Sequence, residues 1–318
     1  MTTSGTYTFT VTRDDIIRQA LLTIGKLAGN EYPKASDTQD CARLLNMMVK
    51  QWMGKGDYAP GLKVWTRKRG HLFLLNTTGQ YSVGPTAVGW TNSYVKPTLA
   101  SAIAVAGTSF SVSDATGIAA ASNIGVVMSD GSLVWNVVST VVGTLITVLT
   151  PYTKIAPVGA QAFSYVTAAQ QPVTIETAVL RDIDNSDTPL RMLTVQDYDM
   201  VSNKADPNNM GDPGAIYYEF QLGNSNMFVD VGACQDVTKH IVVTYMEPVQ
   251  DFVNPLDTPY YPQEWYLPLV LGLGKQAAPM YNKVWSALMQ DNFKDALAIA
   301  QKKDPERITI FFQPGAED

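Results

Sequence analysis

Apolar residues recur with a helical period at the N-terminal end of the chain. Thr12 and Asp15 have the spacing of a capping box, which predicts that a helix starts there and continues to about Gly29. Ser36 and Gln39 have the same spacing and predict a second start. The apolar positions after each start fall on one helix face: Ile17, Ala20, Leu21, Ile24 and Leu27, and then Cys41, Leu44, Leu45, Met48 and Trp52. We therefore predict a helical hairpin.

The C-terminal end of the chain has the same period. A helical segment opens at Pro262, and an apolar stripe over residues 285–300 follows it and ends before Pro305. Pro268 and Pro279 are expected to bend or interrupt the first of these helices. Because two helices alone cannot bury all of their apolar faces, we expect the N- and C-terminal helices to form one bundle.

Between the helical ends, apolar and polar residues alternate with the period of two that is typical of strands. Short alternations separated by turn residues such as Asp130-Gly131 predict an inserted β-sandwich or barrel. A short helix is expected after Thr194, with Asp197 as its capping partner. Further alternations predict a second sheet, with strands over residues 173–180, 215–220, 227–231 and 240–245.

These elements predict an α+β fold: a helical bundle from the terminal helices, a central β layer and an inserted all-β domain. In chain order we expect an N-terminal helical hairpin (1–58), the first part of the β layer (59–95), the inserted sandwich or barrel (96–166), the second part of the β layer (167–250), and C-terminal helices followed by a tail (251–318).

Charge is distributed unevenly along the chain. Only four residues between Gly70 and Ile175 are charged, which sets the predicted insert apart. The whole chain has a net charge of -6, so it has no overall electrostatic attraction to the phosphates of DNA. A hydrophobic content of 46% with 16% charged residues excludes a disordered or coiled-coil chain.

Cys41 and Cys234 are the two cysteines, and neither belongs to a C-x-x-C pair. We therefore expect no disulfide framework, no zinc site and a reducing compartment. No apolar window approaches the length of a membrane span, and residues 1–12 lack the basic start and apolar run of a signal peptide. We expect neither a membrane anchor nor a signal peptide.

Candidate catalytic chemistry is sparse. His71 and His240 lie in strand-like alternation among apolar residues, which favours structural roles, and the chain has no G-x-S-x-G nucleophile motif. We expect no catalytic residue, no metal and no cofactor, and therefore a protein that is not an enzyme. A pair of catalytic carboxylates stays open, because that mechanism specifies a distance between carboxyl groups rather than a motif.

One basic cluster surrounds Trp65. It consists of Lys63, Arg67, Lys68 and Arg69. These side chains are candidates for contact with a nucleic-acid backbone or an acidic partner. The alternative is an exposed edge strand protected by charge.

Several short motifs, taken in order, resemble the podophage head-to-tail adaptor family, also called tail tubular protein A or packaged-DNA stabilisation protein. The motifs are Asp15-Ile16-Ile17, Ala20-Leu21, Ile24-Gly25, Leu44-Leu45-Asn46, Trp52, Arg191-Met192-Leu193-Thr194, Tyr198-Asp199, Ala215-Ile216-Tyr217-Tyr218, Asp251-Phe252, Asn254, Asp257-Thr258-Pro259 and Pro262-Gln263-Glu264-Trp265. The insert at 96–166 departs from the smaller members of the family, which lack it.

The resemblance implies a structural virion protein at the head-to-tail interface, made in the host cytoplasm. Such a protein forms a homo-oligomeric ring, typically a dodecamer, between the portal protein and the tail nozzle (tubular) protein. The ring extends the channel for packaged double-stranded DNA without reading its sequence, helps to retain the genome, and offers a surface for a tail fibre or spike.

A head-to-tail ring needs two different contact patches on each subunit. Candidate aromatic anchors are Trp65, Trp90, Tyr260, Tyr261 and Trp265, with ordinary core positions as the alternative for each. The segment after the last helix contains Ile310, Phe311, Phe312 and Pro314, which we expect to dock on the portal as similar tails do. The alternative is that these residues fold back on the chain's own sheet.

Two other functions remain open from the sequence. One is a receptor- or carbohydrate-binding tail module carried by the insert. The other is a peptidoglycan hydrolase, which would need two carboxylates in a cleft.

Overall fold

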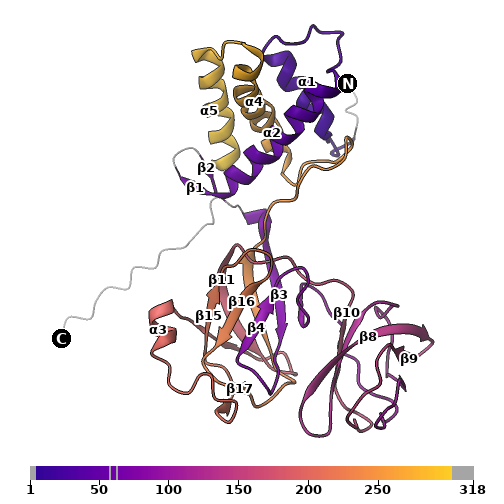
Figure 1. Cartoon of the computed structure of the whole chain (residues 1–318). Coiled ribbons are helices and arrows are strands. Elements are labelled where there is room, and N and C mark those ends of the chain that lie inside the picture. The colour runs from indigo at the N-terminus through magenta and orange to yellow at the C-terminus, as the bar shows by residue number, and fades with distance from the viewer. Residues whose placement is uncertain (1–4, 57–58, 62–63, 303–318) are drawn as a thin grey trace, which may run out of the picture. The chain divides into compact units, whose positions relative to one another are not determined.

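A computed structural model describes residues 5–56, 59–61 and 64–302 (Figure 1). The chain has a mixed α+β fold with several sheets and few helices. It divides into two compact units: unit 1 comprises Met1–Thr66 with Val249–Asp318, and unit 2 comprises Arg67–Pro248. Unit 1 is therefore built from both ends of the sequence.

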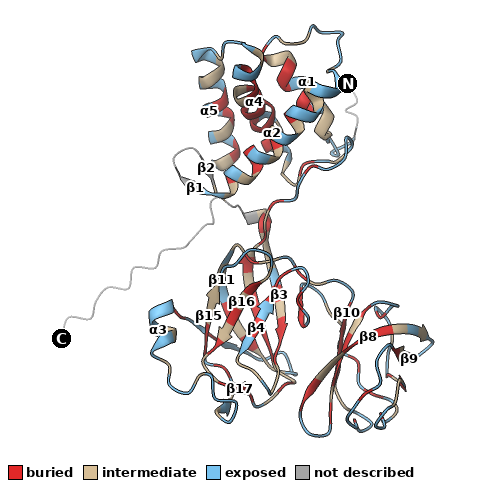
Figure 2. Ribbon diagram, in the orientation of Figure 1, coloured by how far each residue is buried: buried red, intermediate tan, exposed pale blue. Residues whose placement is uncertain are grey.

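Unit 1 contains the long helices of the chain. They are α1 (Arg13–Thr23), α2 (Ala35–Met53), α4 (Tyr266–Ala277) and α5 (Ala287–Lys302), with the short elements β1 (Lys55–Gly56), β2 (Ala59–Pro60), η1 (Val64–Thr66), η2 (Gln263–Trp265) and η3 (Ala278–Tyr281). Residues from all four helices share one hydrophobic core (Figure 2). Pro268 does not break α4, because it lies in the first turn, where a backbone N–H has no partner within the helix.

The helix ends differ in how well local patterns predict them. The capping box of Thr12 and Asp15 is confirmed. Helix α1 ends earlier than predicted, because Gly25 takes a left-handed conformation (φ 68°) and closes the helix in a Schellman motif. The second predicted capping box is wrong: α2 starts at Ala35 after Lys34, so Ser36 already lies inside the first turn.

Unit 2 contains two larger sheets that share a core. In spatial order, one sheet is β12 (Asp187–Pro189), β11 (Thr174–Arg181), β18 (His240–Met246), β3 (Arg67–Phe73) and β5 (Trp90–Thr91), and the other is β13 (Arg191–Met192), β15 (Ala215–Glu219), β16 (Ser225–Val229) and β4 (Gln80–Val83). A short pair, β14 (Met210–Gly211) with β17 (Ala233–Cys234), and helix α3 (Val195–Asp199) complete this part. The predicted cap of α3 at Thr194 is confirmed.

A third sheet of unit 2 lies within residues 96–166. Its order is β10 (Ala162–Tyr165), β7 (Asn123–Val127), β8 (Leu133–Val142), β9 (Leu145–Val148) and β6 (Ser109–Ser111), and it has its own core. Phe73 of β3 packs on Phe163 of β10 with a ring-centroid distance of 4.7 Å. The main-chain N–H of Gly89 also donates to the Tyr165 hydroxyl at 2.9 Å. These contacts hold the third sheet against the rest of unit 2.

Candidate interaction site

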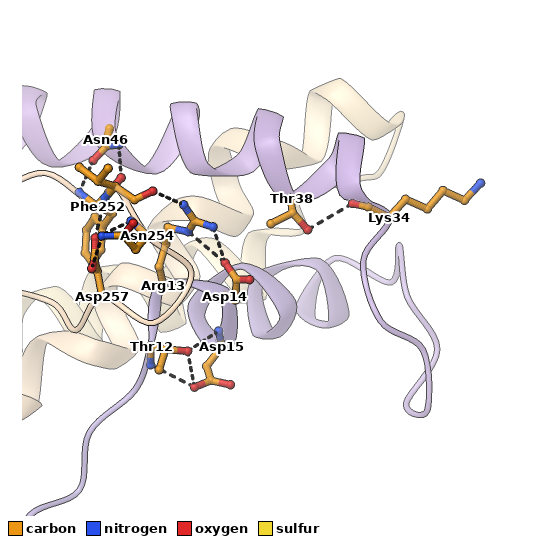
Figure 3. Close-up of polar contacts among 11 residues, drawn as sticks. Thr12, Arg13, Asp14, Asp15, Lys34, Thr38, Asn46, Phe252, Asn254 and Asp257 are labelled. Atoms are coloured by element: carbon orange, nitrogen blue, oxygen red, sulfur yellow. Dashed lines mark hydrogen bonds and ion pairs between the residues drawn. The ribbon is translucent and has the colours of Figure 1, made fainter.

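Residues 251–257, which we call the strap, lie along α1 and α2 in unit 1 (Figure 3). The Asn46 side chain of α2 donates from Nδ2 to the Phe252 carbonyl at 2.9 Å, and its Oδ1 accepts the Phe252 N–H at 2.9 Å. One amide thus satisfies both main-chain groups of Phe252, while the Phe252 ring is buried in the core. The strap is anchored to α2 by side chain and main chain together.

Arg13 at the start of α1 anchors the next residue of the strap. Its Nη1 donates to the Val253 carbonyl at 2.9 Å, and its Nη2 lies 2.8 Å from Oδ1 of Asp14. Asp257 closes the strap, because its carboxylate accepts the N–H groups of Val253 at 2.7 Å and Asn254 at 2.6 Å. These hydrogen bonds from Asn254 and Val253 lower the pKa of Asp257. The strap therefore has a defined conformation.

A third contact ties the strap to the last turn of α2. The Lys50 ammonium donates to the Val249 carbonyl at 2.7 Å and lies 2.6 Å from a carboxylate oxygen of Asp251. Both charged side chains are about half exposed, so this ion pair contributes little to stability and serves mainly to fix the direction of the chain.

A groove of about 610 Å³ lies between α1, α2 and the strap. Its walls combine two arginines, a carboxylate and amide groups with apolar side chains. It is lined by Arg13, Asp14, Ala35, Thr38, Gln39, Ala42, Arg43, Asn46, Phe252, Val253 and Pro255. Such a surface can hold a polar polypeptide segment by hydrogen bonds and charge, and Arg43 is its exposed cation.

The sequence did not single out the residues of this groove as a site. Arg13 follows a helix cap, Asn46 belongs to a motif of the family resemblance, and Pro255 lies more than 200 positions away from either. Asn46 and Asp251-Phe252 both belong to motifs of the family resemblance. Nothing in those motifs indicates that the two segments are in contact.

Four of the aromatic candidates gather in unit 1. The rings of Trp65 and Trp265 have centroids 5.3 Å apart, and the Tyr261 ring lies 5.6 Å from each. Trp265 is 1% exposed, so the expectation that it is an exposed anchor is wrong: it packs in the core. Tyr260 and Tyr261 are partly buried against the same core, and burial raises the pKa of Tyr261.

Trp90 is also a core residue rather than an exposed anchor. It is 0% exposed, and its Nε1 donates to the Gln170 carbonyl at 3.1 Å. Its ring lies where a side chain at Gly70 would be, because a Cβ at Gly70 would come within 2.0 Å of the ring. Trp90 thus fills space that a glycine on the neighbouring strand leaves open.

The basic cluster is largely paired. Arg67 lies 2.6 Å from a carboxylate oxygen of Glu176, and Lys68 lies 3.7 Å from one of Glu247. Arg69 is exposed on β3. Lys63 lies outside the described residues, as do Ile310, Phe311, Phe312 and Pro314.

His71 and His240 face each other on β3 and β18, with ring centroids 5.3 Å apart. Nε2 of His240 lies 3.2 Å from the Tyr94 hydroxyl. Burial, with a contribution from Arg181, lowers the pKa of His71 to about 4 and that of His240 to about 3. Both rings are therefore neutral near pH 7 and form part of a buried aromatic cluster.

Comparison with known proteins gives little further information. No family model matches the chain, and no curated protein matches it. A solved structure with a local likeness is the Gp54 tailspike of Acinetobacter baumannii bacteriophage AP22, in complex with A. baumannii capsular saccharide. The match has 18% identity and a TM-score of 0.21, and it covers 23% of this chain and 14% of the tailspike. This likeness assigns neither a fold nor a function.

Among residues 5–56, 59–61 and 64–302, no helix has both the length and the apolar character to cross a membrane. Within the same residues, no group of three or more His, Cys, Asp or Glu side chains is arranged to hold a metal ion.

Proposed function

We propose that this protein is a head-to-tail adaptor of a podophage virion. The observation that supports this most directly is the contact between Asn46 and Phe252, because both residues belong to motifs of the adaptor resemblance. Two motifs that are distant in sequence thus anchor each other, which gives their joint presence in one chain a structural reason.

The proposed role is assembly rather than chemistry. The helices of unit 1 form the bundle that each subunit contributes to a ring, and the ring, a dodecamer, lies between the portal protein and the tail nozzle protein. The groove beside the strap receives a polar segment of the portal, and Arg43 pairs there with an acidic side chain. Residues 310–314 dock on the portal as a second contact.

The ring continues the DNA channel and is part of the virion. A subunit with net charge -6 repels phosphate, so packaged DNA slides past the wall without sequence recognition. The pairing of Arg67 and Lys68 with carboxylates fits this role, since paired cations neutralise fewer phosphates. We propose no catalytic residue and no cofactor, and a tail fibre or spike as a further partner.

A saccharide-binding role for the third sheet has less support. Every residue of 96–166 is described, and the rings of Phe110, Tyr152, Phe163 and Tyr165 are buried there. Trp135, the remaining aromatic residue of this segment, is half-buried and packs against Phe73 and Tyr165. Aliphatic side chains are exposed instead at the tip of the β8–β9 hairpin, where Val142 is 71% and Leu145 is 44% exposed. Such a tip suits a protein partner better than a sugar.

Co-sedimentation with purified portal rings of the same phage tests the proposal. The chain is expected to sediment with the rings, and Arg43→Glu is expected to weaken this binding severalfold. The matched control is Lys283→Glu, which reverses an exposed charge outside the groove. A wild-type chain that stays in the supernatant contradicts the adaptor function, whereas equal binding of the two variants contradicts only the role of the groove.

A further inference from the structure

The β15–β16 hairpin of unit 2 ends in an exposed apolar tip. Leu222 in this tip is 97% exposed, the highest value among the large hydrophobic residues that the structure describes, and Phe220 is 55% exposed. Apolar residues that are scattered singly over a surface need no explanation, but two of them at the end of one turn form a small apolar surface. We call residues 220–223 the knob.

Hydrogen bonds hold the knob in one conformation. The main-chain N–H of Gln221 donates to Oγ of Ser225 at 3.1 Å. Nε2 of Gln171 donates to the same Oγ at 2.5 Å and also to the Gln221 carbonyl. Gly223 completes the turn with a φ of 92°, which residues with a side chain rarely adopt. Because a turn that is already fixed loses little conformational entropy on binding, the knob is suited to insertion into a pocket.

A carboxylate lies at the base of the knob. Oε2 of Glu219, the last residue of β15, accepts Nε2 of Gln221 at 2.9 Å and Nδ2 of Asn226 at 3.3 Å. Both donors are neutral amides, so they orient the carboxylate without cancelling its charge. A pocket that fits the knob therefore needs an apolar interior and a cation at its edge.

A pocket of about 220 Å³ between α2, α4 and α5 in unit 1 has this combination. Trp52 and Phe293 form its apolar interior, with ring centroids 6.4 Å apart, and both are buried. Lys275 and Lys294 line the same pocket, and none of its described lining residues carries a carboxylate. The Lys275 ammonium lies 5.3 Å from the Phe293 ring centroid, and Lys294 lies 3.7 Å from Asp291 in an exposed pair that contributes little to stability. Both lysines can therefore bind a further carboxylate.

We propose that the knob of one copy inserts into this pocket of a second copy. Leu222 then packs on the rings of Trp52 and Phe293, and Glu219 comes beside the two lysines. The occupant is a second copy because one chain carries both an apolar tip with a carboxylate and an apolar pocket with cations. The knob and the pocket are different patches, so the contact is heterologous, and repetition of it builds a ring or an open chain of subunits. The inference goes beyond the portal contact proposed above and does not depend on it.

Cross-linking between separately labelled chains tests the contact. Gln221→Cys on the knob and Gln51→Cys beside the pocket are made in different chains, mixed at high concentration and treated with a short bis-maleimide. The native Cys41 and Cys234 are 0% exposed and do not compete for the reagent. The matched control pairs Gln221→Cys with Ser36→Cys, an exposed position on the same helix as Gln51 but about 22 Å away along its axis.

We expect severalfold more cross-linked dimer from Gln221→Cys with Gln51→Cys than from the control pair. Equal yields in the two mixtures overturn the proposal. So does a chain carrying both substitutions that cross-links within itself at high dilution, because the knob then fills the pocket of its own copy. Since no portal is present, these outcomes leave the adaptor function to its own test.

Removal of the apolar tip gives a second readout. Leu222→Ser, added to the Gln221→Cys chain, is expected to lower the yield of cross-linked dimer with Gln51→Cys severalfold, because the pocket then receives a polar side chain. The control is Met200→Ser, at another position of unit 2 that is 82% exposed, which is expected to leave the yield unchanged. Neither substitution should shift the thermal unfolding midpoint, since both side chains are exposed. Equal yields from the Leu222→Ser and Met200→Ser chains contradict the insertion of the knob.

Discussion

Asn46 and Phe252 are joined by two hydrogen bonds across a sequence separation of 206 residues. The side-chain amide of Asn46 serves as both donor and acceptor for one residue of main chain, as a neighbouring strand would. This contact fixes the strap on α2 and forms part of one wall of the groove. The contact thus adds a polar anchor to the hydrophobic core that the C-terminal helices share with α1 and α2.

Replacing Asn46 by alanine leaves both main-chain groups of Phe252 without their partners. We expect the free energy of unfolding of unit 1 to fall by about 2 kcal/mol, the order for leaving polar groups unsatisfied in a partly buried site. Urea denaturation followed by circular dichroism measures this loss. Met47→Ala, at a neighbouring position that is 61% exposed, is the control, and equal stabilities of the two variants would show that the contact contributes nothing.

The buried histidines make unit 2 sensitive to acid. In the unfolded chain both titrate near the ordinary pKa of 6.5, whereas in the fold the pKa is about 4 for His71 and about 3 for His240. The unfolded state therefore binds protons first as the pH falls below 6.5. The stability that the two neutral histidines contribute is complete above pH 6.5. It is lost as the pH falls from there toward 4 for His71 and toward 3 for His240, at up to about 1.4 kcal/mol per pH unit for each histidine.

Urea unfolding at pH 7.5, 6 and 5 measures this loss. The groups around the pair are Tyr94, Arg181, Asp187, Arg69 and Lys96. The pKa of Asp187 is lowered, so its carboxylate stays ionised over this pH range. His71→Phe is expected to make the pH dependence shallower. A wild-type stability that is constant between pH 7.5 and 5 would mean that the histidines titrate normally in the fold.

Gly70 is required by the ring of Trp90. A Cβ at this position would come within 2.0 Å of that ring, so Gly70→Ala must displace a fully buried tryptophan. We expect a loss of about 3 kcal/mol, at the upper end for overpacked cores. Thermal unfolding compares it with Gly211→Ala, where the nearest atom outside the chain neighbours is 3.5 Å away. A Gly70→Ala variant as stable as this control would show that the core has room to adjust.

The sequence predicted features that depend on neighbouring residues and missed those that depend on packing. The caps at Thr12 and Thr194 were predictable because a capping box involves residues only three positions apart. Ser36 has the same local spacing, but the helix begins one residue before it, at Ala35. The spacing of a capping box alone therefore does not determine at which of two adjacent residues a helix begins.

The candidate site was harder to predict than the helices. Tryptophan is a residue type that is common at interfaces, and the sequence alone therefore favours Trp90 and Trp265 as anchors. Only their contacts, of Trp90 with Tyr245 and of Trp265 with Trp65, show that they are core residues. The groove joins Arg13, Asn46 and the strap, and no local pattern reports a contact over such separations.

The mass of the purified chain, alone and after mixing with portal rings, tests the central proposal most directly. Light scattering coupled to size exclusion measures it. The proposed function predicts that the complex gains about twelve times the subunit mass of 34.7 kDa on each portal ring. A chain whose mass is unchanged by portal rings, with the rings unchanged as well, would contradict the adaptor function.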